Sequence, residues 1–272
     1  MSDLQSKLSN LREHIDSVDE RLLELLRERA ALVKQVGETK QENGITGSYI
    51  NPKREALMLK RLLEKMQETP YPPEAIVSLW RTLIGASTAM ESPLRLAIHQ
   101  QGSLVPYMLA REYFGSFIPA TMLTDSDDLL AALEDDPHIV GVLNPTGSGE
   151  VKNPWWLRMC QLEKTPYIFA CLPFVQKTSV QSVPFLAIAQ VNVEETGDDI
   201  SYITAIFSGE MPAIGNIIAT CNIGEAGSAA LLRIPGFFAE DSENFANLRH
   251  ALGDSLYEIH FLGAHASPYL IN

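Results

Sequence analysis

The chain has 272 residues, of which 46% are hydrophobic and 20% charged, a composition typical of a soluble globular protein with one or two domains. The net charge of −13 argues against nucleic acid as a partner, and no apolar run approaches the ~18 residues of a membrane-spanning helix. Three scattered cysteines without metal-ligand spacing, and a beginning without the apolar segment of a secretory signal, predict a cytoplasmic protein.

Residues 4 to about 42 are predicted to form one long helix. Apolar residues from Leu4 to Val36 recur at three- and four-residue spacing, and neither Pro nor Gly interrupts them before Gly37. At ~1.5 Å per residue such a helix is roughly 55–60 Å long, which exceeds the diameter of a compact 90-residue domain. We therefore expect its apolar stripe to need a partner chain. A solvent-bridging helix or a coiled coil is the alternative interpretation.

Two further helices are predicted before residue 93. Asn51-Pro52 is a helix start, with Asn as N-cap and Pro at the first helical position, and that helix runs to about Glu68. The proline-rich segment 69–73 interrupts it. The next helix runs from about Glu74 to Glu91, before Ser92-Pro93.

The pattern changes to α/β after Pro93, with short apolar runs at 94–98, 139–143, 167–172 and 185–191 and helical stretches at 103–114 and 126–133. The fold class predicted is a multidomain α and α/β protein. Its regions are a three-helix domain at 1–92, an α/β region at 93–200 and a smaller region at 201–272.

Basic residues interrupt the apolar stripe of the first helix. Arg29 and Lys40 lie within ~20° of each other on one face, because eleven residues separate them. Arg12 lies ~100° away from Arg29 around the helix, so a neighbouring chain would have to deliver it to the same pocket. Because the chain is strongly acidic, a site for an anion has to be locally cationic in this way.

The other two helices also turn polar on their apolar stripes. Glu55 precedes Leu59, Leu62 and Met66, and the stripe of the third helix continues into Ser87 and Glu91. Burial of such groups costs several kcal/mol each unless they are paired. Two interpretations stay open on pattern alone: an internal network in which Glu55 and Glu91 neutralise Arg29 and Lys40, or a pocket for a small polyanion.

Four motifs in order resemble the all-helical chorismate mutase family, as found at the start of bifunctional chorismate mutase–prephenate dehydratases. They are Leu11-Arg12-Glu13-His14-Ile15-Asp16 with Asp19, Leu22 to Arg29, Val36-Gly37-Glu38-Thr39-Lys40, and Pro52-Lys53-Arg54-Glu55. The resemblance covers residues 5–91. It implies an intertwined homodimer of three-helix chains and the conversion of chorismate to prephenate, a pericyclic reaction that requires no metal or cofactor.

The resemblance also implies a role for each matching residue. Arg12, supplied across the dimer, and Arg29 are expected to clamp the two substrate carboxylates, with Arg54 and Ser87 in support. Lys40 is expected to donate to the breaking ether oxygen. Glu55 is expected to accept a hydrogen bond from the substrate hydroxyl. The catalytic residues implied are Lys40, Glu91 and Arg29.

Two positions depart from the family pattern. Asn51 stands where an Asp is usual, and we interpret it as a helix cap in preference to a substrate-binding residue. Glu91 stands where the bacterial enzymes often have Gln. A carboxyl group donates to an ether oxygen only when protonated, so we expect the activity to fall toward alkaline pH.

The C-terminal region resembles a truncated prephenate dehydratase lobe followed by an ACT-like regulatory or scaffold region. The segment from Leu94 to Gly115 resembles the opening of a dehydratase, but Ser182-Val183-Pro184 replaces its Thr-Arg-Phe motif, and Glu-Asn-Ser is absent near Leu143–Thr146. We therefore predict no dehydratase activity. An aromatic amino acid is a possible effector at residues 201–272, and a non-binding scaffold is the alternative.

Two other functions are weighed against the mutase. One is an isochorismate–pyruvate lyase on the same fold, and the other is a non-catalytic regulatory or metabolite-binding subunit of the aromatic amino-acid pathway. The nearly complete cationic set favours an enzyme, whereas the degenerate C-terminal region favours an added regulatory role.

Overall fold

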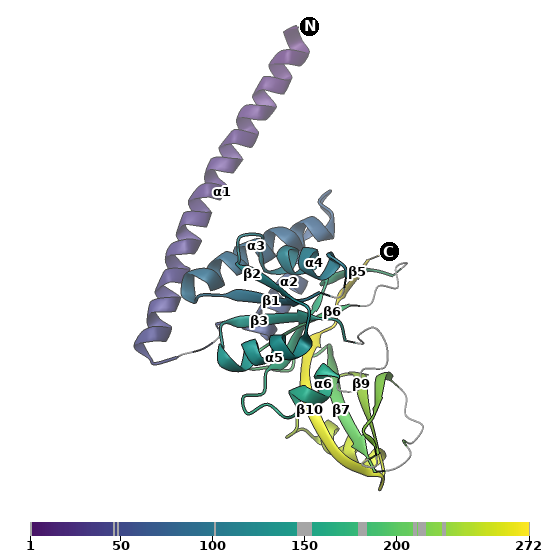
Figure 1. Cartoon of the computed structure of the whole chain (residues 1–272). Helices are drawn as coiled ribbons and strands as arrows, with labels where there is room; N and C mark the ends of the chain where they lie inside the picture. Colours follow the sequence, from purple (N-terminus) through teal and green to yellow (C-terminus); the bar gives the residue numbers. More distant parts are fainter. Residues whose placement is uncertain are drawn as a thin grey trace. The chain divides into compact units, whose positions relative to one another are not determined.

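The computed structural model describes residues 2–45, 47, 49–100, 102–145, 154–178, 184–208, 211, 216–224 and 227–271 (Figure 1). Its contacts divide the chain into two units, residues 1–46 and 47–272. Thr146 and the pair Ser182-Val183, named above for the missing dehydratase motifs, lie outside the described residues. Among the helices of the described residues, none has the length and apolar character needed to cross a bilayer.

The first unit is one helix, α1 (Ser2–Glu42), of 41 residues, which confirms the long helix predicted from the sequence. At ~1.5 Å per residue its length is about 60 Å. Lys40 in its last turn complements the negative end of the helix dipole. Its apolar side chains from Leu4 to Val36 are largely exposed, with Leu11 and Ile15 both at 58%.

Helices α2 (Pro52–Met66) and α3 (Pro73–Glu91) open the second unit. The Asn51 side chain accepts a hydrogen bond from the backbone N–H of Arg54 at 2.9 Å, so the predicted N-cap is confirmed. Leu59 and Leu63 of α2 pack with Ile76 and Ile84 of α3, and the same cluster includes Phe174 of the α/β region. The Lys60 Nζ atom also lies 2.8 Å from Asp198. These two helices are therefore part of the same unit as the α/β region.

The α/β region is built on one nine-stranded sheet in the order β2-β1-β3-β6-β4-β10-β7-β9-β8. Its strands are β1 (Arg95–His99), β2 (Ala120–Leu123), β3 (Ile139–Leu143), β4 (Tyr167–Leu172), β6 (Phe185–Ala189), β7 (Asp199–Phe207), β8 (Ile217–Asn222), β9 (Ser228–Pro235) and β10 (Leu256–Ala266). A separate pair joins β5 (Val175–Lys177) to β11 (Tyr269–Ile271). The predicted order of a helical region followed by α/β structure is confirmed.

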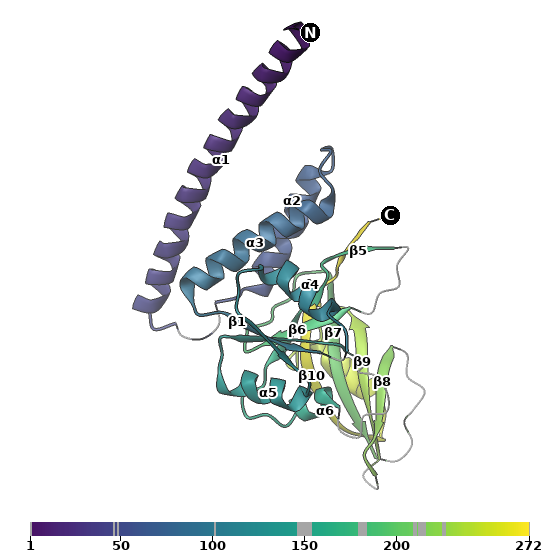
Figure 2. The ribbon, with the colours of Figure 1, turned by 45° about the horizontal axis from the view of Figure 1, so that its top comes forward.

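Helices cover both faces of the first part of the sheet. Strands β1, β2 and β3 are parallel and are connected by α4 (Val105–Phe114) and α5 (Ser126–Asp135). Side chains alternate along β1, so that Leu96 and Ile98 pack with α4 while Ala97 packs with α5 and the short α6 (Trp155–Met159). Helix α3 contacts α4 from the outside (Figure 2).

The sheet continues without interruption past residue 200. Strand β10 pairs in parallel with β4 at Gly263 and Ile168, and antiparallel with β7 along its length. Gly263 has φ +127°, and a Cβ atom there would lie 2.4 Å from the Ile168 backbone nitrogen, so a glycine is required at this junction. Helix α7 (Glu243–Ala251) packs through Phe245 on the β7, β9 and β10 portion. The ACT-like character of residues 201–272 remains a prediction.

Candidate functional site

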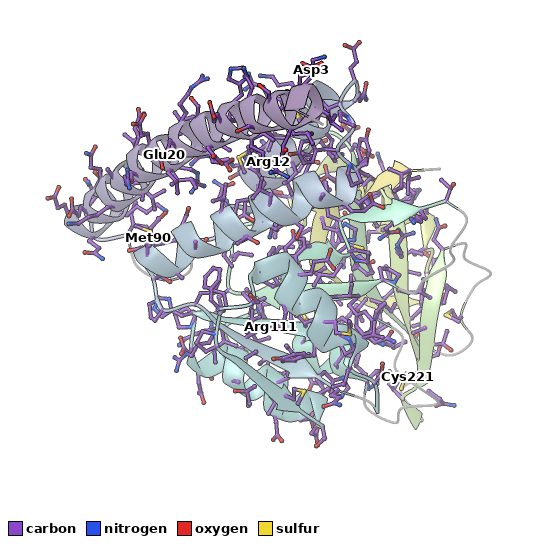
Figure 3. All side chains as sticks on the ribbon, turned by 90° about the horizontal axis from the view of Figure 1, so that it is seen from above. Asp3, Arg12, Glu20, Met90, Arg111 and Cys221 are labelled. Carbon is purple, nitrogen blue, oxygen red and sulfur yellow. The ribbon has the colours of Figure 1, made fainter. Side chains whose placement is uncertain are left out.

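The residues that the sequence assigns to the candidate site, including the helix cap Asn51, come from both units. Arg12 (labelled in Figure 3), Arg29 and Lys40 are on α1. Arg12 is exposed, and the other two are half-buried. In the second unit, Asn51, Arg54 and Glu55 lie at the start of α2, and Ser87 and Glu91 lie in the last two turns of α3. The assembly of these eight residues into one site remains a prediction.

Glu55 is held by an arginine that the sequence analysis did not single out. The Arg81 guanidinium Nη1 lies 2.8 Å from Oε2 of Glu55, and the two side chains are only 3% and 13% exposed. An ion pair removed from water in this way is stable only when further hydrogen bonds satisfy the charged groups. Glu55 of α2 is therefore paired with a residue of α3 that lies 26 positions later in the chain.

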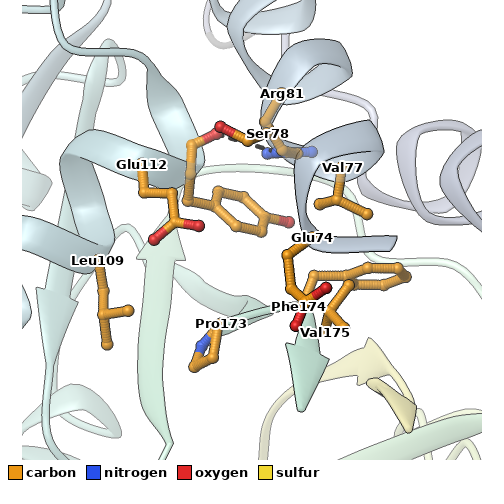
Figure 4. A pocket seen from close by; sticks show the side chains of 10 residues that line it. Glu74, Val77, Ser78, Arg81, Leu109, Glu112, Pro173, Phe174 and Val175 are labelled. Carbon is orange, nitrogen blue, oxygen red and sulfur yellow. Dashed lines mark hydrogen bonds between the residues drawn. The ribbon is translucent and has the colours of Figure 1, made fainter. Parts of the chain in front are cut away.

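Helix α4 supplies the remaining contacts of Arg81. The Arg81 Nε–H donates to the backbone carbonyl of Tyr113 at 3.0 Å, and the guanidinium carbon lies 3.4 Å from the centroid of the Tyr113 ring. Figure 4 shows Arg81 on α3, directed at the end of α4, with this hydrogen bond dashed. Burial raises the pKa of Tyr113 to about 12, while nearby Arg81 opposes this shift. The Tyr113 ring is therefore a neutral platform at neutral pH.

The sequence does contain a signal for Arg81. Val77, Arg81, Gly85 and Thr88 recur at helical spacing, and all four are buried. This stripe lies beside the one formed by Ile76, Trp80, Leu83 and Ser87. A charged arginine on a buried stripe of α3 is as unusual as Glu55 on the apolar stripe of α2. The pairing of Arg81 with Glu55 could not be predicted from the sequence, because it depends on how α2, α3 and α4 pack.

Ser87 and Glu91 lie one turn apart on α3. The buried Ser87 hydroxyl donates to the Leu83 carbonyl at 2.7 Å, a local bond within the helix. Support of a substrate carboxylate by Ser87 would require this hydroxyl to turn away from Leu83, because a hydroxyl has one proton to donate. Glu91 is half-buried at the last residue of the helix.

Two small cavities adjoin Arg81 within the second unit. One, of about 40 Å³, lies between Ser78, Arg81, Glu112 and Phe174 (Figure 4), and the other, of about 10 Å³, lies beside Glu55 and Gly85. Spaces of this size hold one or a few waters. A chorismate-sized dicarboxylate therefore needs walls in addition to those that α2 and α3 provide here.

A wider hollow in the same unit has a volume of about 600 Å³. Its described lining includes the rings of Tyr167, Phe237 and Phe261, one lysine and four carboxylates, namely Lys53, Glu194, Glu195, Glu240 and Asp241. The lysine ammonium is itself 3.6 Å from Glu194. The negative potential of this hollow opposes a dicarboxylate ligand, so it is not the site sought for such a substrate.

The three-helix segment is similar to a known family of helical domains. Residues 11–92, less than a third of the chain, match the family described as chorismate mutase type II.

Curated relatives extend the similarity beyond that domain. The chain is 30% identical over 149 residues to the bifunctional chorismate mutase/prephenate dehydratase of Pseudomonas aeruginosa, covering 54% of this chain and 40% of that protein. The protein of the same name from Aquifex aeolicus is 29% identical over 140 residues, covering 50% and 38%. The T-protein of Enterobacter agglomerans is 38% identical over 87 residues, covering 32% and 23%. The chain thus spans about two-fifths of the length of its first two relatives.

Two solved structures align with 64% of this chain. One is GqqA, described as a novel type of quorum quenching acylase, at 10% identity and a TM-score of 0.42 over 95% of that chain. The other is prephenate dehydratase from Streptococcus mutans, at 9% identity and a TM-score of 0.38 over 99% of that chain.

Proposed function

We propose that this protein is a chorismate mutase, which rearranges chorismate to prephenate in phenylalanine and tyrosine biosynthesis in the cytoplasm. The observation that carries the proposal is the match of residues 11–92 to the chorismate mutase type II family, within which the cationic and carboxylate residues stand in the expected order. The rearrangement needs no nucleophile. The protein has to hold the dicarboxylate in its reactive conformer and stabilise the charge that grows on the ether oxygen.

The roles proposed for the residues follow from their chemistry. Arg12 and Arg29 bind the two carboxylates, because the planar guanidinium fork matches a carboxylate better than an ammonium does. Lys40 and protonated Glu91 donate to the ether oxygen. Arg54 and Ser87 support the carboxylates, and Glu55 accepts a hydrogen bond from the hydroxyl. Asn51 acts as the cap that orients the first turn of α2, which carries Arg54 and Glu55.

A second copy of the chain is proposed as the partner of α1. Leu4, Leu8, Leu11, Ile15, Val18, Leu22 and Leu25 form a helical stripe, and all are at least 44% exposed. Such a stripe favours packing against another apolar surface. In a homodimer built on it, Arg12 of one chain would complete the site of the other.

The C-terminal region is proposed to be non-catalytic, because the dehydratase motifs are missing from the sequence. An aromatic amino acid is the effector to test there, by titrating phenylalanine, tyrosine and tryptophan against the mutase rate. Incubation with prephenate should give no phenylpyruvate.

A direct assay tests the main proposal. The purified chain is incubated with chorismate and, separately, with isochorismate across pH, and products are identified by mass spectrometry and NMR. Prephenate from chorismate is the expected result, whereas pyruvate from isochorismate would indicate the lyase. Binding without turnover at any pH would indicate a regulatory subunit. Arg29→Ala should abolish turnover, and Arg27→Ala, at an exposed position of the same helix, should not.

A further inference from the structure

The contacts of Arg81 fix its side chain from two directions. Nη1 faces Glu55 on α2, Nε–H donates to the Tyr113 carbonyl on α4, and the guanidinium plane lies against the Tyr113 ring. The Phe114 ring lies 5.9 Å away. Arg81 is only 2% exposed, so these protein contacts, and not bulk solvent, surround its guanidinium group. Its position is therefore set before any substrate arrives.

The contact between Arg81 and Tyr113 also stabilises the C-terminal end of helix α4. Tyr113 is the next-to-last residue of α4, and the last four carbonyls of a helix have no partner within it. A cation at this end satisfies one carbonyl and complements the negative end of the dipole. One turn beyond Arg81, Gly85 allows α3 to approach the neighbouring carbonyl of Phe114. Two successive carbonyls of α4 thus face two residues of α3 one turn apart.

The contact with Arg81 restricts the rotamers that the Glu55 side chain can adopt. Glu55 lies in the first turn of α2, where an unpaired glutamate would sample several rotamers. Arg81 donates to Oε2, and no hydrogen bond to Oε1 is found among the described residues, while a carboxylate has about four lone-pair sites. A carboxylate fixed in this way is an acceptor aimed in one direction.

We propose that Arg81 is a positioning residue for the mutase reaction, which holds Glu55 as a fixed acceptor for the substrate hydroxyl, and that the end of α4 is a structural part of the mutase site. The inference rests on the proposed function, and it adds Arg81 and the end of α4, neither of which belongs to the site residues proposed above. It makes the α/β region a support for the reaction even if that region catalyses nothing itself.

A double-mutant cycle tests the proposal on the full chain, with variants Arg81→Gln, Glu55→Gln and the pair together. Each is first checked by circular dichroism for folding. Arg81→Gln is expected to lower kcat for chorismate by about 10- to 100-fold, as expected for a misplaced contact. In the Glu55→Gln background the same change is expected to lower kcat by less than about threefold, because Arg81 acts through Glu55. Equal losses in the two backgrounds would mean a general structural role and would overturn the proposal.

Inhibition provides a readout that stability alone does not move. A bicyclic ether dicarboxylate shaped like the transition state is compared with its analogue lacking the hydroxyl. Wild-type protein is expected to bind the hydroxyl form at least about tenfold more tightly than the form without the hydroxyl. Arg81→Gln should reduce this ratio of affinities toward one. An unchanged ratio in Arg81→Gln contradicts the proposal.

Arg61→Gln is the matched control, because it makes the same substitution at an exposed position of α2, outside the proposed site. It should retain both the rate and the inhibitor ratio. If Arg81→Gln does not fold, Arg81→Lys, which keeps the charge but not the planar fork, is taken through the same cycle. If the wild-type chain does not turn over chorismate, the proposed function itself fails. If the wild-type chain is active but Arg81→Gln lowers kcat equally in both backgrounds, only the role proposed for Arg81 fails.

Discussion

Gly85 of α3 faces the backbone carbonyl oxygen of Phe114 at the end of α4, and a Cβ atom built on Gly85 would lie 2.0 Å from that oxygen. The neighbouring atom is backbone and cannot rotate away, so α3 would have to move off α4 to accept any side chain. This close approach places Arg81, one turn earlier on α3, within reach of the Tyr113 carbonyl.

Gly85→Ala is therefore expected to destabilise the protein, although alanine is the better helix former by about 1 kcal/mol. Overpacking against fixed backbone costs about 1–3 kcal/mol or more, which outweighs that gain. Urea unfolding of the full chain should show a lower midpoint. Ala89→Ser, at an exposed position of α3, is the control and should change stability by less than about 0.5 kcal/mol. A midpoint for Gly85→Ala at or above that of the wild type would contradict the prediction.

The supply of Arg12 across a dimer predicts complementation between two inactive variants. Arg12→Ala and Arg29→Ala should each be inactive as homodimers. In a mixed dimer one site has an intact Arg29 from one chain and an intact Arg12 from the other, while the second site lacks both. Equal mixing with subunit exchange gives about half mixed dimers, and so about a quarter of the wild-type sites.

The measurement is chorismate turnover after the two variants are unfolded together and refolded. Mixing Arg29→Ala with Lys40→Met is the control, and it should restore nothing if both residues serve the site of their own chain. If the mixture of Arg12→Ala and Arg29→Ala forms dimers by light scattering but recovers no activity, Arg12 serves the site of its own chain or lies outside the site.

The chemistry of Glu91 predicts a pH-dependent rate. Its carboxyl group donates a hydrogen bond to the ether oxygen only while protonated, so kcat/KM should fall as pH rises. Glu91→Gln supplies an amide donor at every pH and should flatten that fall. Glu74→Gln, at the opposite end of α3, is the matched control and should leave the profile unchanged. Identical pH–rate profiles for wild type and Glu91→Gln would remove Glu91 from the proposed mechanism.

Buried His265 predicts a pH-dependent stability. Its side chain is 3% exposed in β10, with Nδ1 2.9 Å from the Ala266 carbonyl. Among the described residues, Nε2 has no hydrogen-bond partner. Burial lowers the pKa of His265 from 6.5 to about 4, and the positive charge of Arg233 acts in the same direction.

Between these two pKa values the unfolded chain binds a proton that the folded chain does not, so acidification from pH 6.5 toward 4 favours unfolding. At 1.36 kcal/mol per unit, the contribution of His265 to this loss is on the order of 3 kcal/mol. Chemical denaturation at several pH values should show the slope, and His265→Gln should reduce it. His250→Gln, at an exposed position, should leave the slope unchanged. A slope that is the same in His265→Gln and wild type would be evidence against this assignment.

Local patterns predicted much of the helical and strand content. The long apolar repeat predicted α1, the Asn51-Pro52 pair predicted the start and cap of α2, and the apolar run 139–143 predicted β3. These features depend on residues only a few positions apart, whose local backbone preferences agree with the final fold. The resemblance of this part of the chain to a known family likewise depends on the sequence alone, and the family match over residues 11–92 confirms it.

Tertiary structure decided the partner of Glu55 and the extent of the sheet. Nothing local relates Glu55 to Arg81, or Arg81 to the Tyr113 carbonyl 32 residues later, because each contact exists only when three helices pack together. The parallel pairing of β10 with β4 joins segments almost a hundred residues apart, and it depends on the small volume of Gly263. The sequence determined which polar residues stand on apolar stripes. Packing selected their partners, because a buried charge is stable only beside the groups that the fold brings to it.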